Sequence, residues 1–87
     1  MARLVVVRGR VQGVFYRDSC RSQAEAAGVT GWVSNEPDGT VRALVEGSPV
    51  AVDRVVGWMR KGPPHAFVDG VDVQPAEPEG HGGFEVR

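Results

Sequence analysis

Several residue types on which other classes of protein depend are scarce in this sequence of 87 residues. The single cysteine, Cys20, cannot form a disulfide within the chain, which excludes a scaffold built on disulfides. Only two histidines are present, and no pattern of cysteines or carboxylates completes a zinc site around His65 or His81. We therefore expect neither a metal site nor a cofactor.

Neither sign of charge dominates the chain. Ten Lys and Arg residues stand against eleven Asp and Glu residues, so no overall field favours nucleic acid or an anionic membrane. The apolar run Leu4 to Val7 has the length of a strand and is far too short to span a bilayer. No signal-peptide pattern is present, and we expect a cytoplasmic protein with no membrane or nucleic-acid partner.

The composition that remains is that of a globular domain, with 41% hydrophobic and 24% charged residues. No linker, internal repeat or low-complexity tract divides the sequence, so we expect residues 1–87 to form one domain. A domain of this size buries only about 60 to 65% of the surface that its extended chain exposes. Its core must therefore be compact.

The first half of the chain predicts a strand, a helix and a hairpin. The run at 4–7 is the strand, and helical spacing over 15–27 indicates a helix that Gly28 ends. Strands are expected over 30–35 and 40–46, joined by a turn at 37–39. The expected buried stripe of the helix is Tyr16, Cys20, Ala24 and Ala27. In the second hairpin strand Val41, Ala43 and Val45 should pack, whereas Arg42, Leu44 and Glu46 should face water.

The second half predicts another helix and two strands. Ser48 can cap the helix, Pro49 suits its first position and Gly62 can end it. A strand is expected within 66–74, with Gly70 as a candidate interruption, and a loop over 77–83 leads to a closing strand over 84–87. This order indicates an α+β, ferredoxin-like (βαββαβ) antiparallel sheet with two helices on one face and a short additional C-terminal strand.

The junction between the first strand and the first helix has the features of an anion-binding loop. The first N–H groups of a helix have no partner within it, and the helix dipole places about half a positive charge there. Gly9 and Gly13 permit the tight backbone that several converging N–H groups require. Arg17 adds a planar fork that matches two oxygens of a phosphoryl group. An ordinary glycine-containing turn is an equally good interpretation of this loop by itself.

Four motifs together resemble the acylphosphatase family over essentially the whole chain. They are GRVQGVFYR at 9–17, GWVSN at 31–35, PDG at 37–39 and GFEVR at 83–87. The resemblance implies metal-independent hydrolysis of the carboxyl-phosphate bond of small acyl phosphates, with inorganic phosphate as a product. A monomer is the simplest expectation for the oligomeric state. A carboxylate leaves readily without protonation, so such an enzyme mainly holds the phosphoryl group and places a water in line.

By position in those motifs, Arg17 is expected to bind the phosphoryl oxygens and Asn35 to orient the attacking water. The remaining donors are expected to be the loop amides of Val11, Gln12, Gly13, Val14, Phe15 and Tyr16. Two positions depart from the usual family pattern, Ser34 and Arg42, and neither belongs to the expected catalytic pair.

Other interpretations stay open on the residues alone. A non-catalytic, phosphate-sensing or regulatory ferredoxin-like domain would keep the same loop. An RNA-binding ferredoxin-like module is disfavoured by the low aromatic content and by the near-zero net charge. Cys20 fits a small buried side chain better than a nucleophile. Trp32 fits packing or a pocket wall, and Asp38 fits its turn.

Overall fold

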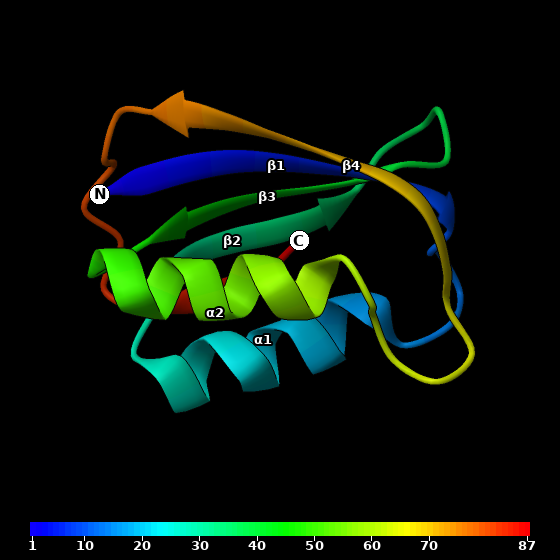
Figure 1. Ribbon diagram of the computed structural model, residues 1–87, viewed down its shortest axis with the longest axis horizontal. Coiled ribbons are helices and arrows are strands. Elements are labelled where there is room, and N and C mark those ends of the chain that lie inside the picture. Colours follow the sequence, from blue (N-terminus) through cyan, green and yellow to red (C-terminus); the bar gives the residue numbers. More distant parts are fainter.

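The computed structural model describes all residues, Met1–Arg87, and shows a sheet with both helices on one of its faces (Figure 1). The sheet order is β4-β1-β3-β2-β5. The first four of these strands pair antiparallel, and β5 runs parallel to β2 at the edge. The predicted ferredoxin-like α+β fold is confirmed, and the added strand makes the sheet mixed. The elements are β1 (Ala2–Arg10), α1 (Tyr16–Ala27), β2 (Thr30–Asn35), β3 (Val41–Glu46), α2 (Pro49–Met59), β4 (Phe67–Ala76) and β5 (Phe84–Val86).

The helix ends follow from local chemistry. Gly28 ends α1 in the left-handed conformation (φ 74°), and its N–H donates to the carbonyls of Ala24 and Glu25. Ser48 caps α2, because its side chain accepts a hydrogen bond from the Ala51 N–H at 3.2 Å. The helix ends at Met59, before the predicted stop at Gly62.

Strand β4 is longer than the sequence predicted and runs without a break past Gly70. Its pairing with β1 instead shifts register between Arg8 and Gly9, so the irregularity is a bulge rather than an end of the strand. Gly9 is required there. Its φ is 128°, and a Cβ atom would lie 2.1 Å from the carbonyl oxygen of Phe67.

The core lies between the sheet and the two helices. Tyr16 is the largest fully buried side chain, and its hydroxyl donates to the Met59 carbonyl at 2.7 Å. Its ring packs against Trp58 with centroids 5.3 Å apart, which joins the two helices. The predicted stripe of α1 is confirmed for Tyr16, Cys20 and Ala24, whereas Ala27 is only partly buried at the end of the helix.

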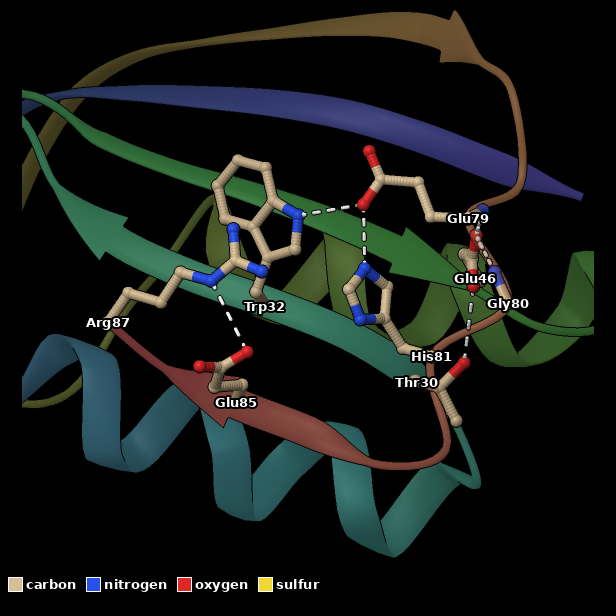
Figure 2. Close-up of polar contacts among 8 residues, drawn as sticks. All are labelled: Thr30, Trp32, Glu46, Glu79, Gly80, His81, Glu85 and Arg87. Carbon is tan, nitrogen blue, oxygen red and sulfur yellow. Dashed lines mark hydrogen bonds and ion pairs between the residues drawn. The ribbon is translucent and has the colours of Figure 1, made fainter.

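The face of β3 that was expected to be wet is partly covered. Leu44 is 2% and Glu46 7% exposed, so this expectation was wrong for both residues. For Glu46 the cause is the segment between β4 and β5, which passes beside its side chain on the sheet face opposite the helices (Figure 2). The carboxylate of Glu46 accepts hydrogen bonds from the N–H groups of Glu79 and Gly80 and so holds this segment in place.

Trp32, on β2, is hydrogen-bonded to the same segment. Its indole N–H donates to the carboxylate of Glu79 at 3.3 Å, and the Arg87 guanidinium lies 4.9 Å from its ring centroid (Figure 2). Glu79 is also paired with His81 at 2.6 Å, and this hydrogen bond is the main cause that lowers the pKa of Glu79. The Glu79 carboxylate thus joins Trp32 on β2 to the segment between β4 and β5.

Neither α1 nor α2 combines the length and the apolar character that a membrane-spanning helix needs.

Candidate functional site

A pocket of about 270 Å³ opens where β1 passes into α1. The end of β2 and the end of β5 complete it, so three segments far apart in the sequence meet there. Its lining residues are Val11, Gly13, Phe15, Tyr16, Arg17, Asp18, Asn35 and Val86.

The loop before α1 wraps around the pocket through two left-handed residues. Gly13 has φ 74° at no steric cost, whereas Phe15 has φ 63° although it carries a side chain. A non-glycine residue held in this region costs about 1 to 3 kcal/mol, and such strain concentrates at functional sites. The side chain of Phe15, at the cap position of α1, accepts no hydrogen bond. The first-turn N–H groups therefore have no side-chain partner at that position.

Arg17 lies in the first turn of α1 and lines the pocket. Its Nη1 donates to the backbone carbonyl of Arg87 at 2.6 Å, so the residue that follows β5 orients the guanidinium. The hydrogen bond uses one of five guanidinium N–H groups. The helix dipole and the guanidinium make this part of the pocket positive, while the exposed Asp18 carboxylate lies 4.0 Å from Arg21.

Asn35 is the last residue of β2 and reaches the same pocket. Its side-chain oxygen, Oδ1, is buried and has no hydrogen-bond partner. Buried polar atoms nearly always have a partner, so an unpartnered amide oxygen beside a pocket calls for a ligand or a water. The structure thus brings together the two side chains that the motifs singled out.

Four of the six loop residues whose amides are expected to donate line the pocket. Val11, Gly13, Phe15 and Tyr16 line it, whereas Gln12 and Val14 do not. The side chain of Gln12 turns toward the β2–β3 turn, where Nε2 donates to the carbonyls of Glu36 at 2.8 Å and Thr40 at 2.9 Å.

Three contributions to the pocket were missed from the sequence. Asp18 and Val86 line it, and the carbonyl of Arg87 accepts the hydrogen bond from Arg17. The GFEVR motif at 83–87 was a signal that this segment matters, but a backbone carbonyl carries no mark in a sequence. Only the pairing of β5 with β2 brings that carbonyl to the pocket.

Two further titratable residues discussed above, Cys20 and Asp38, have structural roles. Burial raises the pKa of the Cys20 thiol to about 12, so it is a protonated core side chain. Burial first, and the neighbouring Cys20 second, also raise the pKa of Tyr16. Asp38 accepts from the hydroxyl of Thr40 at 2.6 Å and from its N–H at 3.0 Å, which lowers the pKa of Asp38 and stabilises the turn. No group of three or more His, Cys, Asp or Glu residues is placed to hold a metal ion.

The fold and the pocket define a ferredoxin-like α+β protein that presents an arginine on its first helix and an asparagine on its second strand to one pocket. The profile of one family, described as Acylphosphatase, matches residues 3–86. A protein from Rubrobacter xylanophilus named Acylphosphatase is 59% identical over 85 residues, which are 95% of this chain and 76% of that relative.

Solved structures agree with the sequence relatives. An acylphosphatase from Coxiella burnetii superposes on this chain with a TM-score of 0.95 at 37% sequence identity. The match covers 99% of this chain and 90% of the Coxiella chain. An acylphosphatase from Bacillus subtilis superposes with a TM-score of 0.94 at 34% identity, over 100% of this chain and 99% of its own. This chain belongs to the acylphosphatase family and is an enzyme of that family.

Proposed function

We propose that this chain hydrolyses the carboxyl-phosphate bond of small acyl phosphates, giving a carboxylate and inorganic phosphate. The observation that carries the proposal is that Arg17 and Asn35 line one pocket at the amino end of α1, although they lie on different elements. Family membership supports the reaction.

The phosphoryl group is proposed to bind at the amino end of α1. The loop amides from Val11 to Tyr16 and the first-turn N–H groups are proposed to donate to its oxygens, and four of these loop residues, Val11, Gly13, Phe15 and Tyr16, line the pocket. The guanidinium of Arg17 keeps N–H groups free for two further oxygens, because Arg87 accepts only from Nη1. Charge that develops on the phosphoryl oxygens is thereby stabilised by groups that need little rearrangement.

Asn35 is proposed to hold the attacking water. A water placed against Oδ1 would give this buried, unpartnered oxygen the hydrogen bond it lacks. The amide both accepts and donates, so it can orient the water's lone pair toward phosphorus. The carboxylate leaving group departs without protonation, so the chemistry depends on positioning.

We further propose that residues 1–87 act as one domain, as a monomer in the cytoplasm. Both sheet edges are unsuited to pairing with another sheet. At one edge β5 has only three residues, and at the other β4 carries Asp69, Asp72 and Pro75. Size-exclusion chromatography with light scattering tests the monomer, and a concentration-dependent dimer mass would contradict it.

The function is tested by hydrolysis of benzoyl phosphate in the presence of EDTA, with Arg17→Ala and Asn35→Ala as comparison variants. We expect rapid turnover by the parent chain, loss of both turnover and phosphate binding in Arg17→Ala, and loss of turnover with retained phosphate binding in Asn35→Ala. A folded parent chain that binds phosphate without turnover would instead be a phosphate-sensing domain. An Asn35→Ala rate within a few-fold of the parent would exclude the water-positioning role.

A further inference from the structure

Gln12 belongs to the loop of the pocket, yet its side chain points out of the pocket. Its Nε2 atom donates to the carbonyl of Glu36 at 2.8 Å and to the carbonyl of Thr40 at 2.9 Å. An amide NH₂ group has two hydrogens, so both of its donors are used. The side chain is therefore a two-point connection from the loop to another part of the chain.

The two carbonyls frame the turn that follows Asn35. Within this turn the N–H of Glu36 donates to the Thr40 carbonyl at 2.9 Å, and the N–H of Gly39 donates to the Glu36 carbonyl at 3.0 Å. Each carbonyl oxygen has two lone pairs, and Gln12 occupies the second acceptor position of each. Gln12 thus holds both ends of the turn, Glu36 and Thr40, and Glu36 directly follows Asn35.

No direct backbone pairing joins the loop to Asn35. The loop leaves the end of β1, whereas Asn35 ends β2, and β3 lies between these two strands in the sheet. The loop and the β2–β3 turn lie at the same end of the sheet (Figure 1). Among the side-chain hydrogen bonds of the structure, the two from Gln12 are the only ones that link loop residues 11–15 to residues 35–41.

We infer that Gln12 is a positioning residue that sets the distance and direction between the phosphoryl group in the loop and the water on Asn35. This inference rests on the proposed function. In-line attack depends on that geometry, and displacement by about 1 Å can lower a rate by about 10²-fold. Phosphate itself contacts the loop and Arg17, so its affinity does not depend on where the turn lies.

The test uses two variants that keep the size of the side chain and remove the donors, Gln12→Met and Gln12→Glu. Glutamate also places a carboxylate against the two carbonyl oxygens, so its effect should be at least as large. In both variants we expect kcat for benzoyl phosphate to fall by at least about tenfold, with the inhibition constant of inorganic phosphate within about threefold of the parent. Circular dichroism shows whether each variant is folded.

Asp38→Ala is the matched control. It also removes two hydrogen bonds from this turn, those from the N–H and the hydroxyl of Thr40, but it leaves the connection to the loop intact. We expect its kcat to stay within about threefold of the parent, because Gln12 still locates the turn. A fall in kcat equal to that of Gln12→Met would mean that any loosening of the turn has this effect, and would overturn the specific role of Gln12.

A double-mutant cycle with Asn35→Ala separates positioning from a general effect. If Gln12 acts through Asn35, Gln12→Met lowers kcat by less than about twofold when Asn35 is already alanine. The inference would be overturned by additive losses of kcat in the cycle or by an unchanged kcat in Gln12→Met. It would also be overturned by a phosphate inhibition constant that rises as much as kcat falls. If Asn35→Ala alone has no effect, the proposed water-positioning role of Asn35 fails and the inference about Gln12 fails with it, whereas the absence of turnover in the parent chain would overturn the proposed function itself.

Discussion

The guanidinium of Arg17 shows how much of this site depends on the shape of one side chain. Its charge sits in the first turn of α1, where the helix dipole disfavours a cation unless an anion is near. Its Nη1 is held by the Arg87 carbonyl at 2.6 Å, which leaves the rest of the planar fork for a ligand. Geometry as well as charge should therefore matter for turnover.

Arg17→Lys tests this point, because it keeps the charge and loses the fork. A lysine can satisfy either the Arg87 carbonyl or a phosphoryl oxygen, but it cannot reproduce the bidentate contact. We expect kcat/KM for benzoyl phosphate to fall by about 10² to 10³-fold, with weaker inhibition by inorganic phosphate. Steady-state kinetics at several phosphate concentrations measure both. Activity equal to the parent would mean that only the charge is needed.

At the scale of elements, close backbone contacts set how the strands pack. Gly31, on β2, has φ 135°, and a Cβ atom there would lie 1.9 Å from the carbonyl oxygen of Leu44 on β3. Its N–H also donates at 2.9 Å to the carbonyl of Gly83, the residue just before β5. One glycine therefore lies where β2 contacts both of its neighbouring strands. Since β2 carries Asn35 and β5 leads to the Arg87 carbonyl, this junction locates both sides of the pocket.

Gly31→Ala should destabilise the protein by at least about 3 kcal/mol, because the new methyl group collides with backbone and the φ value is strained. Gly57→Ala is the matched control on α2. Gly57 has no neighbouring atom within 4 Å of the added carbon, and its φ value is not in the left-handed region. There we expect a gain of about 0.5 to 1 kcal/mol from helix propensity. Urea unfolding measures whether the free energy of unfolding falls in Gly31→Ala and rises in Gly57→Ala. Equal changes in the two variants would contradict this account.

At the scale of the whole molecule, the core excludes water from two ionisable groups. Burial raises the pKa of Cys20 from 9.0 to about 12 and also raises the pKa of Tyr16 above 10.0. Both groups stay protonated in the folded state at pH values where they ionise in the unfolded chain. The unfolded state is then favoured as the pH rises, because it alone can release these protons.

Global stability should therefore fall as the pH rises above about 9, by at most about 1.4 kcal/mol per pH unit for each group. Below pH 9 the same groups are protonated in both states and add no pH dependence. Cys20→Ala removes the component that begins near 9.0 and leaves the one from Tyr16. Urea unfolding of both proteins between pH 7 and about 11 measures the difference in slope. Parallel curves would show that Cys20 does not titrate between the two states.

Much of the architecture was determined by the sequence itself, because local chemistry decides where elements begin and end. The Ser48 cap, the turn at Asp38 and the stop at Gly28 were predicted and found, since each acts over a few residues. The apolar periodicity gave the α+β order and most of the core. The motifs gave the family and named Arg17 and Asn35, the two side chains that line one pocket.

Other features were decided only by tertiary structure, because they depend on residues that lie far apart in the sequence. Glu46 is buried against the segment that follows β4, where it accepts from the N–H groups of Glu79 and Gly80, and the alternation along β3 could not reveal this contact. The link from Gln12 to the β2–β3 turn requires β1, β3 and β2 to lie side by side first. The Arg87 carbonyl reaches Arg17 only once β5 has paired with β2, since a backbone atom has no position until the chain that carries it is folded.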